Sequence, residues 1–184
     1  MFLLGQPSDD LAIDTLTAVE READENEDIV LGQYIDTYSN LTTKALSGLA
    51  WRLEHCPGPA FSLSIDDDTY VDLDQLLKQH LARLPTADFV ECSQRTVVNG
   101  KVWRKGDWAV SNTVYDADNY PNYCNGPCYL MSQETSRQLF DASRKTVSDL
   151  PADDAFITGV LRAKLEIPLI QVNILQWAFL TQQF

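Results

Sequence analysis

Hydrophobic residues recur along this chain with two periods, and segments of the two kinds follow one another. The segment Phe61–Ile65 alternates apolar and polar residues, which is typical of a half-buried β-strand. Leu41, Ala45 and Leu49 instead recur at every fourth position, which predicts an amphipathic helix from Asn40 to about His55. The same reasoning predicts strands at 2–5, 28–31, 61–65, 89–92 and 167–172, and helices from Asp9 or Asp10 to 22 and at 40–55, 72–84, 133–143 and 153–164.

Strands that alternate with helices indicate an α/β protein with a mainly parallel central sheet and flanking helices. We expect residues 1–184 to form a single domain, since no linker, repeat or low-complexity tract interrupts them. Asn99-Gly100 is a common hairpin turn, and it predicts a hairpin between 96–98 and 101–103.

Three adjacent carboxylates, Asp66, Asp67 and Asp68, follow directly after the strand at 61–65. In open α/β sheets, ligands bind at the carboxyl ends of the strands. Like charges side by side repel one another unless a cation lies among them, and oxygen ligands favour a hard divalent ion such as Mg²⁺ or Mn²⁺. The triplet is therefore a candidate metal site.

A second acidic pair, Asp153-Asp154, opens the helix at 153–164. Acidic residues at a helix start cap free N–H groups and interact favourably with the helix dipole, so a purely structural role is the simpler interpretation. A carboxylate held rigidly there also suits a general base. We expect Asp153 to cap the helix and Asp154, about 100° further round it, to face the site.

An aromatic loop lies upstream of this pair. Residues 120–129 contain three tyrosines, two asparagines and a glycine, and Trp108 precedes them. Aromatic rings beside amide groups suit the binding of sugars, although packing onto the core explains them equally well. Trp108, Tyr123, Gly126 and Asp153 are the candidate contacts to a sugar.

Composition excludes some partners. The net charge of −13, from 27 acids and 14 bases without a basic block, makes nucleic acid and anionic membrane surfaces poor partners. Cys56, Cys92, Cys124 and Cys128 lack a zinc-like second pair, and disulfides and free thiols remain equally open for them. The sequon Asn40-Leu41-Thr42 is explained better as a helix N-cap than as a glycosylation acceptor.

An ordered series of motifs resembles glycosyltransferase family 31, the β-1,3-galactosyltransferase and β-1,3-N-acetylglucosaminyltransferase type of hexosyltransferase. The matching segments are FLLG at 2–5, D-x-Y-x-N-L-T-x-K at 36–44, the strand and acid triplet at 61–71, W-x-V at 108–110, Y-P-x-Y-C-x-G at 120–126 and D-D-x-F-x-x-G at 153–159. Each is weak alone, but together, in order, they are specific.

The resemblance implies a GT-A (Rossmann-like) fold, Mn²⁺, and a donor such as UDP-galactose or UDP-N-acetylglucosamine. It implies inverting transfer to a hydroxyl of a glycan on a glycoprotein or glycolipid, on the lumenal side of the Golgi membrane. By the same resemblance, Asp68 binds the metal, Asp66, Asp67 and Lys44 bind the donor, and Asp154 is the catalytic base. The alternative is a catalytically inactive sugar-binding or interaction domain of the same fold.

The chain departs from the family pattern in informative places. Ser64 stands where the family has a lysine two positions before the triplet, and Cys128 stands where it has a glycine. The strand and helix that precede FLLG in the family, and its N-terminal membrane anchor, are not in this sequence. We therefore expect an N-terminally incomplete catalytic domain, which would reach a membrane only through that anchor.

Overall fold

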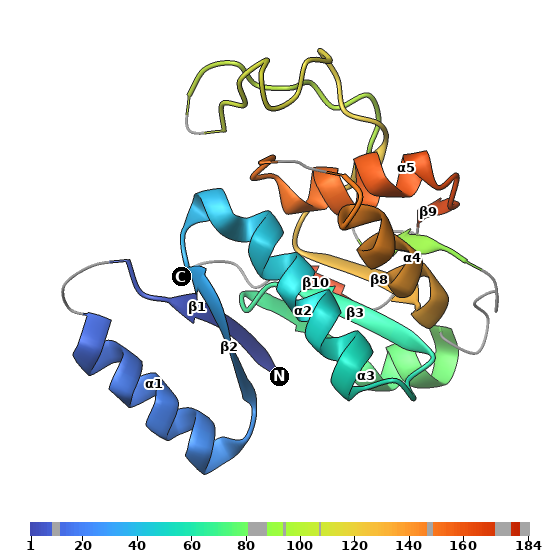
Figure 1. The fold of residues 1–184 in the computed structure, drawn as a ribbon. Helices are drawn as coiled ribbons and strands as arrows, with labels where there is room; N and C mark the ends of the chain where they lie inside the picture. Colours follow the sequence, from blue (N-terminus) through green and yellow to red (C-terminus); the bar gives the residue numbers. More distant parts are fainter. Residues whose placement is uncertain are drawn as a thin grey trace.

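The computed structural model describes residues 1–8, 12–80, 88–93, 95–106, 108–146, 149–171 and 178–180. Helices cover a four-stranded sheet, and a two-stranded unit with its own helix lies beside them (Figure 1). The strands are β1 (Phe2–Gln6), β2 (Ile29–Ile35), β3 (Phe61–Ile65), β4 (Thr69–Val71), β5 (Val90–Cys92), β6 (Thr96–Val97), β7 (Tyr123–Cys124), β8 (Cys128–Ser132), β9 (Leu169–Gln171) and β10 (Ala178–Leu180). The helices are α1 (Ala12–Asn26), α2 (Leu41–His55), α3 (Leu73–Gln75), α4 (Gln133–Ser143) and α5 (Arg162–Lys164), with a 3₁₀ turn η1 (Tyr38–Asn40) and π-helical segments η2 (Leu76–His80) and η4 (Ala155–Leu161).

Most of the predicted elements are confirmed in kind and position. The predicted helix start at Asp9 or Asp10, the predicted helix end at Leu84 and the predicted strand end at Val172 lie outside the described residues. Asn40 stands at the N-cap position of α2, but its side chain does not cap the helix. The amide instead donates to the carbonyl of Ile35 at 2.9 Å and ties the turn back to β2.

The four-stranded sheet has the order β3-β8-β5-β9. Three strands point in one direction, since β3 and β5 are both antiparallel to β8 and β9 is parallel to β5. The prediction of a mainly parallel sheet is not confirmed, because the reversed strand β8 makes two of the three pairings antiparallel. The sequence pattern missed β8 because all its residues are buried, so no apolar–polar alternation marks it.

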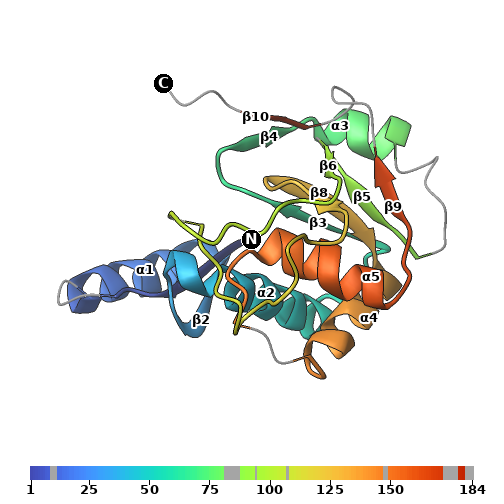
Figure 2. The same cartoon turned by 90° about the horizontal axis from the view of Figure 1, so that it is seen from above.

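Both faces of β8 are covered. Tyr129 and Met131 belong to the larger core, whereas Cys128 and Leu130 point to a smaller cluster around Leu76 and Phe89. Figure 2 shows α2, α4 and α5 on one side of the sheet and α3 on the other. Helix α4 packs on β8 and β3 and also contacts α2 and η4, and η4 in turn contacts β7.

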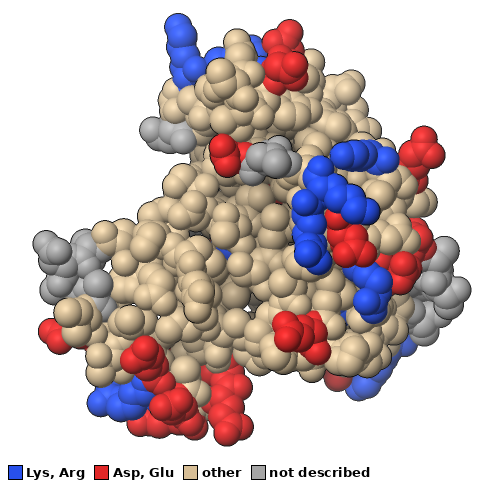
Figure 3. All heavy atoms as spheres, in the orientation of Figure 1, with Lys and Arg blue, Asp and Glu red and all other residues tan. Residues whose placement is uncertain are grey.

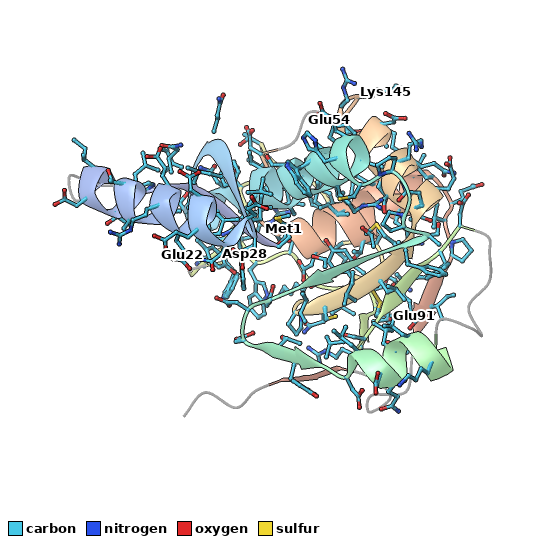
Figure 4. The ribbon with its side chains drawn as sticks, turned by 90° about the horizontal axis from the view of Figure 1, so that it is seen from below. Met1, Glu22, Asp28, Glu54, Glu91 and Lys145 are labelled. Carbon is cyan, nitrogen blue, oxygen red and sulfur yellow. A yellow bond between two sulfur atoms is a disulfide. The ribbon has the colours of Figure 1, made fainter. Side chains whose placement is uncertain are left out.

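Strands β1 and β2 form a separate parallel pair, with Leu3 opposite Val30 and Leu4 opposite Leu31. At its start, Phe2 N donates to the carbonyl of Asp28 at 2.7 Å, and Met1 and Asp28 lie side by side in Figure 4. Helix α1 connects the two strands, which gives a βαβ unit as the alternation of periods predicted.

The ring of Tyr34 fills the space above Gly5, so we expect Gly5→Ala to destabilise the fold by about 1–3 kcal/mol, the usual cost of overpacking. An added Cβ would lie 2.6 Å from the Tyr34 ring and 2.7 Å from the Tyr34 carbonyl oxygen. Urea unfolding would measure the loss. Gly58→Ala is the matched control, because nothing lies within 4 Å of its Cβ position. Equal stability of the two variants would contradict the close approach.

The predicted hairpin at Asn99-Gly100 is wrong. Strand β6 pairs with β7, Thr96 opposite Cys124, and Lys101 bridges Asn119 instead of residues just across the turn. Asn99 adopts a positive φ of 48°, which asparagine tolerates, but it does so in an irregular stretch of a long antiparallel ribbon. The Asn-Gly signal agreed with the backbone conformation of Asn99 but was misleading about the segment that pairs with β6.

The Cys92–Cys124 disulfide joins β5 to β7 and thereby fixes one end of this ribbon to the sheet. Cys56 and Cys128 carry free thiols, so one pairing resolves the alternatives that the sequence left open. Within the described residues, none of the helices has the length and apolar character needed to cross a membrane.

Candidate active site

The acid triplet lies at the carboxyl end of β3, as predicted. Ile65 is the last paired residue of the strand, opposite Cys128. Asp66 N then donates to the carbonyl of Pro127 at 2.8 Å, and Thr69 N donates back to the carbonyl of Asp66 at 3.1 Å. These bonds close a tight turn into β4, and the turn presents Asp66, Asp67 and Asp68 at an exposed edge.

The second acidic pair lies at the start of η4, and both of its carboxylates accept backbone N–H groups there. The Asp153 carboxylate accepts from Asp154 N, in agreement with the predicted capping role. Asp154 stands at the N-cap position of η4, and its Oδ1 accepts from Ala155 N at 2.6 Å. Its Oδ2 accepts from Gly126 N at 3.0 Å, so one carboxylate joins the helix start to the aromatic loop. Helical backbone begins at Asp153, as the pattern indicated, and η4 follows from Ala155.

The two acidic segments, far apart in sequence, share one electrostatic environment. Partial burial raises the pKa of Asp66, and the carboxylates of Asp68, Asp67 and Asp154 raise it further. Burial raises the pKa of Asp153 to about 6, with further contributions from Asp154 and Asp66. Burial also raises the pKa of Asp154, while the N–H groups of Gly126 and Ala155 oppose that rise. The cluster is exposed at Asp66–Asp68 and mostly buried at Asp153 and Asp154.

Tyrosines line the buried side of this acid cluster, which we define as Asp66–Asp68, Asp153 and Asp154. Tyr129 is 5% exposed on β8, opposite Ser64, to which its phenol is hydrogen-bonded. Burial raises the pKa of Tyr129, and Asp153 raises it further. Burial and then Asp154 raise the pKa of Tyr123. The structure therefore places Gly126 in contact with Asp154, puts Tyr123 within the electrostatic influence of Asp154, and adds Tyr129 to the residues around the cluster.

Sequence reasoning missed Tyr129 as a site residue, and it also missed Tyr38. Tyr38 lies in η1 before α2, and its ring meets the edge of Trp108 with centroids 4.6 Å apart. The register of β8 against β3 would have revealed Tyr129, but β8 itself was not predicted. The only sequence signal for Tyr38 was its place in the D-x-Y-x-N-L-T-x-K segment.

Lys44 does not pair with the acid triplet. Its ammonium contacts Asp36 Oδ2 at 2.9 Å and Oδ1 at 3.1 Å, and Asp36 also accepts from Gly5 N at 2.9 Å. These bonds lower the pKa of Asp36 against the opposing effect of its partial burial. The ion pair stands at the ends of β1 and β2, beside a pocket of about 190 Å³; the pocket is lined by Leu4, Gly5, Pro7, Thr15, Leu16, Val19, Leu31 and Asp36.

The donor set at the triplet fits a hard divalent cation that is completed by its substrate. In the part of the chain that the structure describes, no three His, Cys, Asp or Glu side chains converge as a metal-binding group. Mg²⁺-like ions, however, are commonly held by one or two carboxylates together with substrate phosphates. Asp68, whose Oδ1 lies 3.4 Å from the Thr69 hydroxyl, and Asp66 provide such carboxylates on an exposed turn. A cation there would relieve the repulsion that raises the pKa of Asp66.

The acid turn at the end of β3 and the carboxylate at the start of η4 contribute to one acidic cluster, and the Gly126 N–H ties that cluster to the aromatic loop. Comparison with known proteins shows the family. The family model described as galactosyltransferase matches residues 1–173, and the chain belongs to that family.

Several curated relatives are β-1,3-galactosyltransferases by name. Human β-1,3-galactosyltransferase 5 is 30% identical over 174 residues, which cover 94% of this chain and 54% of the relative. Human β-1,3-galactosyltransferase 9 is 28% identical over 159 residues, 83% of this chain and 41% of the relative. Mouse β-1,3-galactosyltransferase 1 is 29% identical over 164 residues, 88% and 49% respectively. The chain thus spans about half the length of these relatives.

Proposed function

We propose that this chain is the catalytic part of an inverting hexosyltransferase. It moves galactose or N-acetylglucosamine from a UDP-sugar to a hydroxyl of a glycan acceptor, in β-1,3 linkage, on a GT-A-like fold. The observation that carries the proposal is the convergence of Asp66–Asp68 and Asp153–Asp154 on one cluster in a chain of the galactosyltransferase family.

On the donor side, Asp68 binds the metal, and Asp66 and Asp67 lie beside the diphosphate and hexose. Mn²⁺ held there with the diphosphate would act as a Lewis acid and neutralise the charge that grows on departing UDP. Without a counter-ion, the three carboxylates would repel a diphosphate, so donor binding requires a cation. The raised pKa of Asp66 supports this requirement, because the neighbouring carboxylates contribute to it. Lys44 would add a positive charge only if it exchanged Asp36 for a phosphate oxygen.

On the acceptor side, Asp154 takes the proton of the attacking hydroxyl. Inversion requires this base on the face of the anomeric carbon opposite the departing phosphate. The N–H groups of Gly126 and Ala155 hold the Asp154 carboxylate in place, so it meets the hydroxyl without reorganising. Asp153 and Tyr123 surround the acceptor end, and Gly126 positions the base.

The proposed setting is the lumenal side of the Golgi membrane, with glycoproteins or glycolipids as acceptors. The Cys92–Cys124 disulfide supports it, because disulfides persist in oxidising compartments and are rare in the cytosol.

We expect Asp68→Ala to weaken Mn²⁺-dependent binding of UDP by about 100-fold or more, because loss of a metal ligand costs more than the roughly 10- to 100-fold typical of its supporting residues. Calorimetric titration of UDP with and without Mn²⁺ measures this. Asp74→Ala is the matched control: it removes a nearby carboxylate whose side chain is 80% exposed and ion-paired with Lys78.

Undiminished metal-dependent binding by the Asp68→Ala variant would exclude the donor site proposed here. Release of UDP from UDP-galactose by the unmodified chain separates an enzyme from an inactive binding domain, since a binding domain would hold the donor without cleaving it.

A further inference from the structure

The segment of the aromatic loop around β7 lies along the helical segment η4. One edge of β7 pairs with β6, and on that same edge Asn125 N donates to the Arg95 carbonyl at 3.0 Å. The main-chain groups of a strand alternate between its two edges. Those of residues 122, 124 and 126 therefore face the opposite edge, where η4 lies.

Three side chains, four residues apart along the helical segment, each bind one main-chain group of that edge. The bonds join Asp154 Oδ2 to Gly126 N at 3.0 Å, Thr158 Oγ1 to Cys124 N at 2.9 Å, and Arg162 Nη2 to the Asn122 carbonyl oxygen at 2.9 Å. We call these three bonds the side-chain ladder. Four residues of an α-helix advance about 6 Å and two residues of a strand advance about 6.6 Å, so the two spacings match.

The π-helical form of η4 helps to keep the ladder on one side of the helix. In an α-helix each fourth residue is rotated by about 40° from the one before it, so Asp154 and Arg162 would diverge by about 80°. The i→i+5 turn of a π-helix holds more residues and reduces this rotation. The packing is close as well, since a Cβ added to Gly159 would lie 3.0 Å from the Cβ of Tyr123.

Hydrogen bonds along the helix also join the members of the ladder to one another. The Thr158 hydroxyl donates to the Asp154 carbonyl at 2.6 Å, and Arg162 Nε donates to the Thr158 carbonyl at 2.9 Å. A helical threonine that bonds back to the carbonyl four residues earlier is common and has no functional meaning by itself. Here, however, the same fully buried hydroxyl also accepts from Cys124 N, so it connects the residue that carries the base to the loop.

Arg162 has a simpler interpretation, as one of many surface cations. Lys and Arg side chains gather over α4 and α5 on the face shown in Figure 3, and a basic residue there needs no specific partner. Each nitrogen of the Arg162 guanidinium, however, donates to a main-chain carbonyl: Nε to Thr158 at 2.9 Å, Nη2 to Asn122 at 2.9 Å and Nη1 to Ile167 at 3.0 Å. The planar group thus joins three segments in a fixed geometry, which a lysine would not reproduce.

We propose that Thr158 is a positioning residue for the Asp154 base, and that Arg162 supports it at the outer end of the ladder. By fixing the loop against the helix, Thr158 keeps Gly126 N on Asp154 Oδ2. Each carboxylate oxygen of Asp154 then accepts one N–H and retains a lone pair for the acceptor hydroxyl. The inference deepens the proposed function and rests on it.

The first test is amide hydrogen exchange, followed by NMR on the 184-residue chain. Thr158→Val keeps the branched shape and removes the hydroxyl, so it should speed exchange of the Gly126 amide by about tenfold or more, the scale of one hydrogen bond to a carboxylate. Thr158→Ser keeps a hydroxyl and should keep the protection. If Thr158→Val sped exchange at Cys124 while Gly126 stayed protected, Thr158 would be a local structural contact and the proposal would be overturned.

Thr135→Val is the matched control. Thr135 is 0% exposed, like Thr158, and its Oγ1 accepts from Phe89 N at 3.0 Å, outside the ladder. The control should speed exchange at Phe89 and leave Gly126 unchanged, whereas equal acceleration at Gly126 in both valine variants would overturn the proposal. If Thr158→Val does not fold, Arg162→Lys at a partly exposed position provides the test: it should speed exchange at Gly126 to a smaller extent, and no change there would overturn the ladder.

Kinetics give a readout that a purely structural role would not produce. Thr158→Val should lower kcat for hexose transfer by about 10- to 100-fold, since misplacing a catalytic group by about 1 Å costs on the order of 10²-fold. The KM for the UDP-sugar should not change, because the donor carboxylates lie on the turn after β3. Thr158→Ser should retain kcat. Equal losses of kcat in Thr158→Val and Thr135→Val would contradict the inference.

The two proposals fail differently, because hydrogen exchange requires no turnover. If Thr158→Val releases the Gly126 amide but Asp154→Asn leaves transfer unchanged, the ladder is supported and the assignment of the base is overturned. If Asp154→Asn abolishes transfer while Thr158→Val changes neither the exchange at Gly126 nor kcat, the positioning role is excluded and the proposed function stands.

Discussion

Asp154→Asn should reduce hexose transfer by about 10³-fold, because a weakly acidic sugar hydroxyl needs a base to lose its proton and general-base catalysis is worth roughly 10²- to 10⁴-fold. Binding of UDP with Mn²⁺ should persist, since the donor carboxylates stand on a different segment, at the end of β3. Transfer of radiolabelled hexose, set beside calorimetric binding of UDP, measures the two effects separately.

The geometry of Asp154 also predicts a structural cost that a simple base would not show. Each of its carboxylate oxygens accepts one N–H, from Ala155 and from Gly126. Asparagine offers one oxygen and one NH₂ group, so it keeps the helix cap but faces Gly126 with a donor. We therefore expect the variant to lose about 1–3 kcal/mol of stability, the cost of a buried polar group left unsatisfied.

Asp153→Asn is the matched control for this experiment, since it removes the neighbouring carboxylate and leaves both bonds of Asp154 intact. A milder loss of transfer is expected from it. The alternative is chemically reasonable, because burial brings the pKa of Asp153 to about 6, near the working range of a general base. If Asp153→Asn abolished transfer while Asp154→Asn preserved it, the two roles would be exchanged.

The accuracy of each sequence-based prediction depended on whether the feature is determined by neighbouring residues or by residues distant in the sequence. The strand Phe61–Ile65 and the helix Gln133–Ser143 depend on local periodicity and capping, and both have the predicted bounds. Local rules also placed the acid triplet at its strand end. Strand β8 carries no alternation because it is buried on both faces, and the direction of the sheet was misjudged with it.

Features that depend on distant partners were not predictable. The partner of β6 is 26 to 28 residues away and is held by the Cys92–Cys124 disulfide, whose pairing the sequence left open. The contact between Tyr38 and Trp108 joins the start of α2 to a distant loop, which Arg104 holds by hydrogen bonds to the carbonyls of Val110 and Tyr115. The acids of the cluster and Tyr123 were candidates from the sequence, whereas Tyr38 and Tyr129 were recognised only in the fold.

Asp153→Asn should also stabilise the protein, by up to about 3 kcal/mol at pH 7.5. Burial, then Asp154 and Asp66, raise the pKa of Asp153 from its ordinary 3.8 to about 6 in the folded state. Each unit of this pKa rise corresponds to about 1.4 kcal/mol, so ionised Asp153 destabilises the folded state by up to about 3 kcal/mol. Asparagine keeps the shape and removes the charge.

The direction of the pKa shift determines the pH range in which Asp153→Asn stabilises the protein. Below pH 3.8 Asp153 is protonated in both the folded and the unfolded state, so the substitution should not change the free energy of unfolding. Between pH 3.8 and about 6 the unmodified chain loses stability as the pH rises, and above pH 6 the full difference between the two proteins is present. Urea unfolding in EDTA at pH 3.5 and 7.5 measures it, with Asp74→Asn, an exposed acid, as the control. Added Mn²⁺ and UDP should reduce the stabilisation by Asp153→Asn, because a bound cation compensates the negative charge of the Asp153 carboxylate. A gain that is equal at both pH values would show that the mutation acts through packing, and a loss at pH 7.5 would show that Asp153 is compensated in the folded chain.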